Sequence, residues 1–248
     1  MTVADLGSVR QLQRLSLLGG SVPPAGARAL AGLEHLEELS LNVARLNDAA
    51  IKELANCRKL SRLDLGFNNL DKITLTPLRT IKPLKSLSLR STDITDDFVK
   101  HLVAFENLEE LVLDNNVVSD AGLAHIASLT KLRELSICNT VITDDGLKHL
   151  RRLKNLRTLR AASTSITEAG IKALKEYLPN LRIDLTPKQR LEAAGKECRG
   201  PLPRCLCFPP NVTCWDKEGK EDVARSESLH LTRLRLLGVE CNPDSLGP

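Results

Sequence analysis

The stretch LEELVLDNNVVSDAGLAHIASLTK, residues 108–131, is followed directly by LRELSICNTVITDDGLKHLRRLKN, residues 132–155, and the two align over 24 positions without a gap. The same unit opens with leucine seven times along the chain, at Leu12, Leu36, Leu60, Leu84, Leu108, Leu132 and Leu156. We number these units copies one to seven and count positions from the opening leucine. Positions 4, 6, 11, 16, 19 and 22 are also apolar. A fixed period in this range is typical of a solenoid, because a single unit cannot bury its own apolar side chains.

The spacing of the apolar positions changes within each copy. Positions 4 and 6 alternate with period two, which predicts a short strand. Positions 16, 19 and 22 step by three, which predicts one face of a short helix. Helix-start pairs lie between these two segments, at Thr95-Asp96, Ser119-Asp120, Thr143-Asp144 and Thr167-Glu168. The hydroxyl can accept from a free backbone N–H and the acid complements the positive end of the helix, so each copy is predicted to be strand, turn and helix.

Position 9 carries a small polar side chain in five copies, namely Asn68, Thr92, Asn116, Thr140 and Thr164. We expect these side chains to bond the backbone of their own turn and of the neighbouring copy, where the strand has ended and ladder hydrogen bonds are lost.

The pattern L-x-x-L-x-L-x-x-[TN]-x-[IV] resembles the consensus of leucine-rich repeats. The continuation T-x-I-T-D-x-G-L, at Thr140–Leu147, is similar to a 24-residue subclass abundant in planctomycete-type bacterial proteins and to the repeats of F-box substrate receptors. The resemblance covers roughly residues 3–185. It implies an α/β leucine-rich repeat solenoid, a horseshoe with a parallel sheet on the concave face and short helices on the convex face. Copies one and three depart from it, with Pro23-Pro24 and Lys72-Ile73 in place of Thr-Asp.

Four regions follow from where the period starts and stops. Residues 1–11 are predicted to be an N-terminal half-repeat or cap helix, and residues 12–185 to hold seven copies and a terminal strand. Thr186-Pro187 with Gln189 predicts a capping helix over residues 186–196. Residues 197–248 hold five of the seven cysteines and the only tryptophan, and are predicted to be a weakly ordered tail.

Composition narrows the class of partner and the compartment. The formal net charge of +4 is spread along the chain, which disfavours a nucleic-acid binder with a concentrated basic face. No apolar run is long enough to span a membrane and no signal peptide is visible, so we expect a cytoplasmic monomer without a membrane partner. Cys57 and Cys138 are expected to be reduced thiols.

The concave strand face is the first candidate site, because positions 3, 5, 7, 8 and 10 are expected to point outward there. In the central copies we predict partner contacts at Asp64, Phe67, Arg90, Asp93, Glu110, Asp114, Asn115, Glu134, Asn139 and Arg160. Phe67 and Arg90 are of the residue types enriched at interaction hot spots. The alternative is that all ten are ordinary solvated positions.

The tail cysteines and three of the histidines are candidate metal ligands, but their spacing does not favour a metal site. The tail cysteines form C-x6-C-x-C-x6-C, which lacks the short C-x2–4-C spacing of zinc sites, and a disulfide cap would need export. The histidines that recur 24 residues apart, His101, His125 and His149, fit a solvated helix face. We expect no metal and no cofactor.

A non-catalytic protein-interaction scaffold is therefore the leading function. The alternative is a substrate-recognition subunit of a ubiquitin ligase, which would need an F-box ahead of the repeats, where 11 residues precede Leu12. An enzyme is a distant third, because no nucleophile with its base and no phosphate-binding loop is visible.

Overall fold

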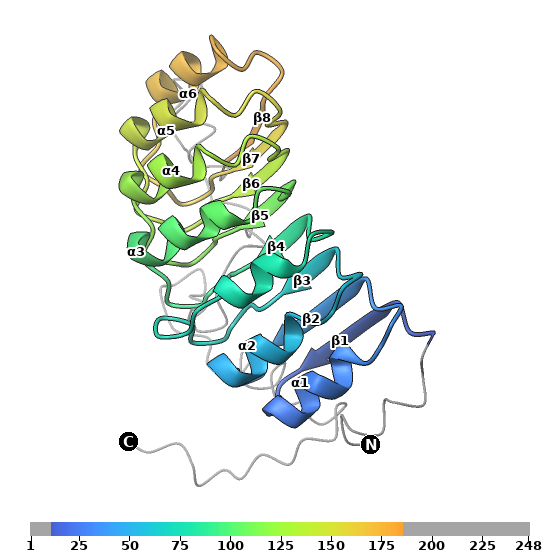
Figure 1. The fold of residues 1–248 in the computed structure, drawn as a ribbon. Coiled ribbons are helices and arrows are strands. Elements are labelled where there is room, and N and C mark those ends of the chain that lie inside the picture. The colour runs from blue at the N-terminus through green and yellow to red at the C-terminus, as the bar shows by residue number, and fades with distance from the viewer. Residues whose placement is uncertain (1–10, 186–248) are drawn as a thin grey trace, which may run out of the picture. The chain divides into compact units, whose positions relative to one another are not determined.

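The computed structural model describes residues 11–185, which form one parallel sheet of eight strands in sequence order, with the helices packed on one side of it (Figure 1). The strands are β1 (Arg14–Leu18), β2 (Glu38–Asn42), β3 (Arg62–Asp64), β4 (Ser86–Ser88), β5 (Glu110–Val112), β6 (Glu134–Ser136), β7 (Thr158–Arg160) and β8 (Arg182–Asp184). The predictions for the half-repeat at residues 1–10, the capping helix 186–196 and the tail 197–248 lie outside the described residues.

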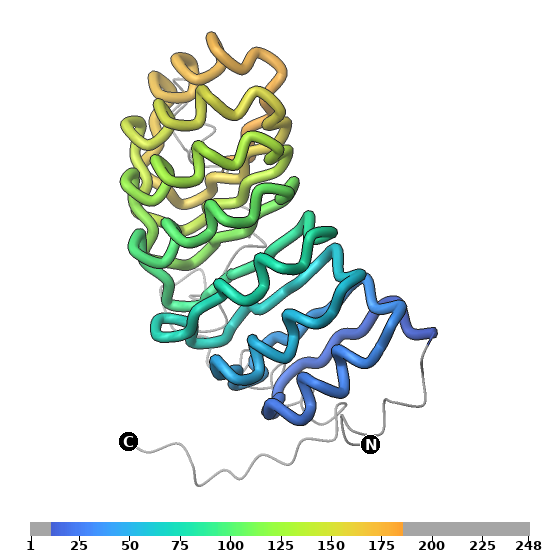
Figure 2. Tube along the Cα trace, viewed as in Figure 1, coloured from blue at the N-terminus to red at the C-terminus, as the bar shows by residue number. Residues whose placement is uncertain are grey.

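The helical layer is less regular than the sheet. The α-helices are α1 (Pro24–Ala31), α2 (Asp48–Leu54), α3 (Asp96–Val99), α4 (Asp120–Ile126), α5 (Asp144–Leu150) and α6 (Glu168–Lys175). Two 3-10 helices, η2 (Thr76–Thr80) and η3 (Lys100–Ala104), complete copies three and four. The chain trace makes one circuit per copy, with the strand on one side and the helix on the other (Figure 2).

The strand register repeats the sequence period, since each strand residue pairs with the residue 24 further on, as in Leu39↔Leu63 and Leu135↔Leu159. Position 4 therefore stacks on position 4, and these leucines are at most 2% exposed from Leu39 to Leu159. Leu12, Leu15 and Leu17, in copy one, are only partly buried. The α/β solenoid predicted from the period is confirmed.

The asparagines at position 9 bond the backbone of their own turn and of the neighbouring copy, as expected. The Asn116 amide donates to the carbonyl oxygens of Leu89 (2.7 Å) and Leu113 (2.9 Å), and its oxygen accepts from the Thr92 backbone N–H (3.0 Å). Thr140 donates only within its own copy, to the Ile137 carbonyl oxygen (2.7 Å). The asparagine side chain thus hydrogen-bonds the backbone of two copies, whereas this threonine side chain hydrogen-bonds only the turn of its own copy.

The acid that follows each helix cap has a further role that the sequence did not reveal. Asp96 accepts from the backbone N–H of Ser119 (2.8 Å) and from its hydroxyl (2.5 Å). Asp120 makes the same pair of bonds to Thr143, at 2.8 and 2.6 Å. The carboxylate therefore pins the cap of the following copy as well as complementing its own helix.

Copy three interrupts this arrangement. Lys72 occupies the position of the acid, and the chain continues as an extended turn into η2 instead of an α-helix. Thr95, in the next copy, makes no side-chain capping bond, so its predicted role as a cap acceptor is wrong. A cavity of about 390 Å³ opens between copies three and four, lined in part by Ile73 and Phe98.

Candidate interaction surface

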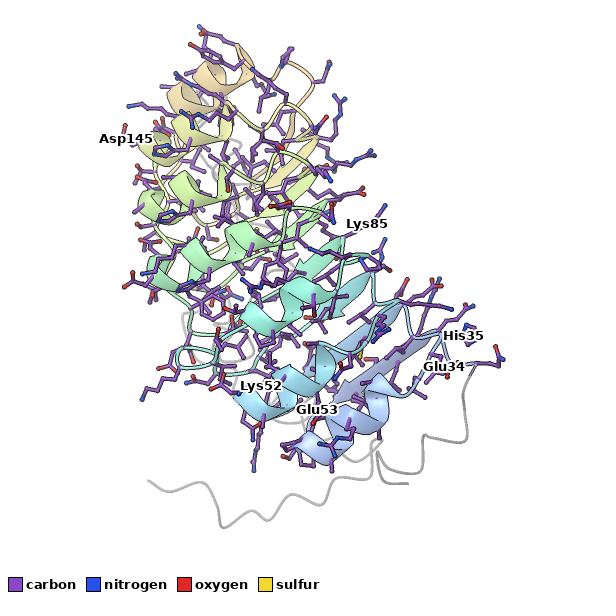
Figure 3. All side chains as sticks on the ribbon, in the orientation of Figure 1. Glu34, His35, Lys52, Glu53, Lys85 and Asp145 are labelled. Atoms are coloured by element: carbon purple, nitrogen blue, oxygen red, sulfur yellow. The ribbon has the colours of Figure 1, made fainter. Side chains whose placement is uncertain are left out.

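The strand face consists of positions 3, 5 and 7 of each copy and is the face that the sequence predicts to be concave. Lys85, beside β4, projects on the strand side, and Asp145, at the start of α5, projects on the helix side (Figure 3). Strands about 4.8 Å apart place successive position-3 side chains within reach of one another. That row is Arg14, Glu38, Arg62, Ser86, Glu110, Glu134, Thr158 and Arg182.

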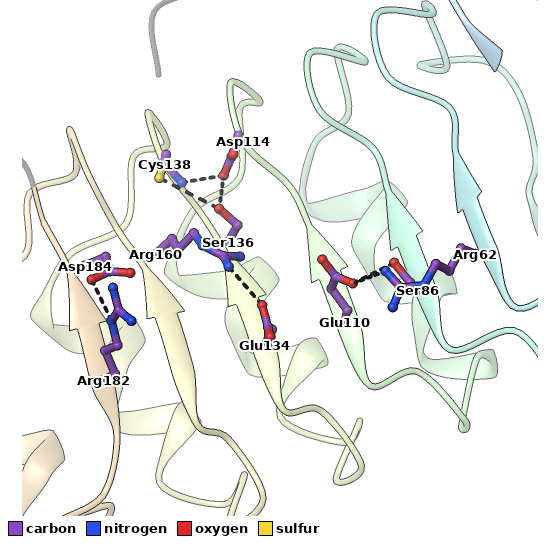
Figure 4. A network of polar contacts seen from close by, with 10 residues as sticks. All are labelled: Arg62, Ser86, Glu110, Asp114, Glu134, Ser136, Cys138, Arg160, Arg182 and Asp184. Atoms are coloured by element: carbon purple, nitrogen blue, oxygen red, sulfur yellow. Dashed lines mark hydrogen bonds and ion pairs between the residues drawn. The ribbon is translucent and has the colours of Figure 1, made fainter. Parts of the chain in front are cut away.

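Charges along the N-terminal part of this row pair from strand to strand. Glu38 lies between Arg14 (3.5 Å) and Arg62 (3.8 Å), and Arg62 also reaches Glu110 (3.8 Å) across copy four. Ser86 donates to the same Glu110 carboxylate (2.9 Å; Figure 4). These pairs are exposed and each contributes at most about 1 kcal/mol. A partner can therefore replace them at little energetic cost.

We call the paired side chains of Arg14, Glu38, Arg62 and Glu110 the charge ladder. The charge ladder borders a hollow of about 450 Å³, which is lined by strand residues of copies one to five. Asp64, one of the predicted contacts, lies in it and accepts from the Asn42 amide (2.9 Å) and the Gly66 backbone N–H (3.0 Å). Further along the sheet, Arg160 pairs with Glu134 at 2.9 Å (Figure 4). Predicted contacts Asp64, Glu110, Glu134 and Arg160 thus do share the strand face.

Asp114 differs from the expectation that it points outward. It is 8% exposed, and its carboxylate accepts from the Ser136 hydroxyl (2.7 Å) and the Cys138 backbone N–H (2.8 Å; Figure 4). The placement of Asp114 among exposed contact residues is therefore wrong, since a buried and hydrogen-bonded carboxylate supports the fold.

The thiols at Cys57 and Cys138 are both buried. Burial raises the pKa of the Cys57 thiol to about 12, so its nucleophilic thiolate form is negligible near neutral pH. The compartment inferred from these cysteines stays a prediction.

Position 8 is in the left-handed region of backbone conformation in every copy: Gly19, Val43, Phe67, Ser91, Asn115, Asn139 and Ser163. Asparagine and glycine tolerate this conformation best. The predicted contacts Asn115 and Asn139 also bond one another, since the Asn139 amide donates to the Asn115 side-chain oxygen (2.9 Å). They form a polar row beside the strand face.

Val43 and Phe67 are the unusual members of that column. Their φ angles are 58° and 57°, where a branched or bulky side chain is strained by about 1–3 kcal/mol. Both are also exposed, and the Arg90 guanidinium lies 5.8 Å from the centre of the Phe67 ring. The sequence singled out Phe67 but missed Val43, and also missed Leu18, which is exposed at position 7 of copy one. The recurrence of Gly and Asn at position 8 was the available signal.

Replacing Val43 by asparagine is expected to raise the free energy of unfolding by about 1 kcal/mol, because asparagine relieves the strain at this φ. Urea denaturation of the two proteins measures the change. Val141→Asn is the matched control, since Val141 is also exposed but has no positive φ, and we expect no stabilisation there. Equal effects at both positions would show that the backbone conformation of Val43 is not the cause.

The remaining sequence candidates lie away from the strand face. Asp93 lines the cavity between copies three and four instead, with a positive φ of 59°. His101, His125 and His149 are exposed on the helical side, as expected. Within residues 11–185 no group of three or more His, Cys, Asp or Glu side chains is arranged to hold a metal ion. No helix in that range is long and apolar enough to cross a membrane.

Comparison with known proteins supports the repeat assignment. No protein-family model matches the sequence, and no curated protein matches it either. Among solved structures, internalin C2 from Listeria monocytogenes is 30% identical, with a TM-score of 0.56 over 77% of this chain and 79% of the internalin. A second internalin from that organism, InlF, is 24% identical, with a TM-score of 0.52 over 75% of this chain and 58% of its own length.

Internalins are leucine-rich repeat proteins, and this chain shares their repeated strand-and-helix arrangement. The chain belongs to the leucine-rich repeat proteins, and the likeness supports a protein-interaction scaffold in general terms. The subclass suggested by T-x-I-T-D-x-G-L stays a prediction.

Proposed function

We propose that this chain is a non-catalytic scaffold that binds a protein partner on its strand face. The observation that carries the proposal is the ladder of exposed, mutually paired charges around the hollow of β1 to β5. Eight strands span roughly 34 Å, close to the width of one side of a standard interface. Exposed ion pairs can be exchanged for pairs with a partner, which supplies specificity and steers association.

Charge reversal tests the proposed face. Glu110→Lys, in the charge ladder, should lower the affinity for a partner isolated by affinity capture at least about tenfold. The lysine places a like charge beside Arg62 and repels the group of the partner that complements Glu110. Asp145→Lys is the matched control, since Asp145 is an exposed acid paired with Lys148 on α5. Isothermal titration of the captured partner against both variants gives the affinities.

The two variants also separate the alternatives. Asp145 is exposed and Glu110 is half-buried beside the exposed Arg62, and neither acid is in the core, so both proteins should remain folded. Weaker binding by Asp145→Lys with unchanged binding by Glu110→Lys would place the partner on the helical side and contradict the proposal.

A further inference from the structure

Three large apolar side chains are exposed where the first three strands end. Leu18, Val43 and Phe67 are 66%, 44% and 36% exposed. Backbone hydrogen bonds hold their copies side by side, since the Val43 N–H donates to the Gly66 carbonyl oxygen (3.2 Å) and the Phe67 N–H to that of Arg90 (2.8 Å). Leu18, Val43, Phe67 and Arg90 therefore occupy successive copies along one edge of the strand face. We call these four residues the turn-edge patch.

Two residues of the patch are unfavourable for the fold itself. Copies one and four to seven place Gly, Ser or Asn at position 8, whereas copies two and three place Val43 and Phe67 there, with φ near +57°. These two side chains are strained by the backbone and only partly shielded from water. Neither folding nor solubility accounts for a strained, exposed apolar side chain, whereas contact with a partner does.

Arg90 supplies the charge that defines the partner. The strand face carries five arginines within residues 11–185, and four of them, Arg14, Arg62, Arg160 and Arg182, pair with a carboxylate. Arg90 has no ion pair among the described residues. Its Nε is buried without a hydrogen-bond partner there, and its guanidinium faces the Phe67 ring.

Asp64 and Asp114, in the copies on either side of Arg90, have other hydrogen-bond partners. Asp64 accepts from Asn42 in copy two and from Gly66 in its own copy, and Asp114 accepts from Ser136 and Cys138 in copy six. Arg90, in copy four, thus keeps a guanidinium without an ion pair among the described residues, and its natural complement is a carboxylate, which can accept from the two terminal nitrogens together.

We propose that the turn-edge patch binds an extended partner segment in which apolar side chains lie within about four residues of a carboxylate of Asp or Glu. The inference rests on the proposed function and specifies its partner. Three copy spacings separate Leu18 from Arg90, about 14 Å, which an extended chain covers in about four residues. The apolar side chains pack on Leu18, Val43 and Phe67, and the carboxylate pairs with Arg90.

Selection from a phage-displayed library of random peptides, with the full chain as bait, tests this chemistry. We expect recovered sequences to share large apolar residues with an acid within about four positions of them, always on the same side. A synthetic peptide carrying that motif should bind Arg90→Gln at least about tenfold more weakly than wild type, in fluorescence anisotropy. Arg152→Gln, an exposed arginine on the helical side, should leave the affinity unchanged.

Phe67→Asn separates binding from folding. It should lower the affinity for the peptide at least about tenfold, while the melting temperature of the protein stays equal or rises. Selection of no motif, a motif without an acid, or equal binding by wild type and Arg90→Gln would overturn the proposal. Glu110→Lys could lower the affinity for the captured partner while Arg90→Gln and Phe67→Asn leave it unchanged. That result would support the strand face as the binding site and contradict only the proposed role of the turn-edge patch.

Discussion

Asn116→Ala is expected to lower the free energy of unfolding by about 4 kcal/mol, the largest effect of any single polar substitution proposed for this chain. The Asn116 amide is buried and serves the backbone of two copies, through the carbonyl oxygens of Leu89 and Leu113 and the N–H of Thr92. Alanine leaves these groups without partners away from water, and each such group costs about 1–3 kcal/mol. Urea denaturation with a constant m-value measures the loss.

Two companion variants make the result specific. Asn116→Thr should cost less, because a threonine at position 9 can still donate within its own copy, as Thr140 does to Ile137. Asn155→Ala is the surface control: its amide makes one exposed bond, to the Thr130 carbonyl oxygen (2.9 Å), and its loss should cost about 0.5 kcal/mol. Since the Asn155 bond also joins two copies but is exposed, similar losses for Asn116→Ala and Asn155→Ala would show that burial of the Asn116 bonds adds little to stability.

The repeat lattice was predictable from the sequence because burial requires it. Each copy must present the same apolar positions to its neighbours. The apolar positions that recur every 24 residues therefore predicted the strand, the helix and their order directly. The role of position 9 was predictable for the same reason. A polar side chain that recurs between two buried columns must satisfy the backbone that stops pairing there.

The outward positions were predicted less well, for a geometric reason. Alternation orients a side chain only while the strand continues, and β3 to β8 end at position 5, as at Asp64 and Val112. Positions 7, 8 and 10 lie in the turn, where backbone conformation decides the direction. Asp114 is consequently buried and Asp93 faces another cavity, while the strain at Val43 was indicated in the sequence only by the Gly and Asn that share its column.

The acid after the helix cap packs closely against the glycine at position 15 of the next copy. A Cβ built on Gly122 would lie 2.5 Å from Asp96 Oδ1, and those built on Gly146 and Gly170 would also collide with the aspartate of the preceding copy. In two places where the acid is missing, the glycine is missing as well: Pro24 is followed by Ala50 one copy on, and Lys72 by Phe98. Asp48 is the exception, because the residue one copy on is Thr74, in the irregular copy three.

Gly146→Ala is accordingly expected to lower the free energy of unfolding by about 2 kcal/mol, even though alanine favours helices over glycine. The new methyl group would displace the Asp120 carboxylate, which accepts from the backbone N–H (2.8 Å) and hydroxyl (2.6 Å) of Thr143. Gly32→Ala is the matched control. Gly32 ends α1 at a φ of −74° with its nearest Cβ neighbour at 3.3 Å, so the cost should stay below about 0.5 kcal/mol.

The decisive measurement is the double-mutant cycle with Asp120→Ala. Alone, Asp120→Ala should cost about 2 kcal/mol, because the Thr143 backbone N–H loses its acceptor. With Asp120 already removed, the methyl group of Gly146→Ala enters vacated space, so the double variant should also lose about 2 kcal/mol and not the sum of about 4 kcal/mol. Copies two and four are native examples of this compensated state, at Ala50 and Phe98. Additive losses would mean that the aspartate can turn aside from position 15, and that the joint absence of acid and glycine, at Pro24 with Ala50 and at Lys72 with Phe98, has another cause.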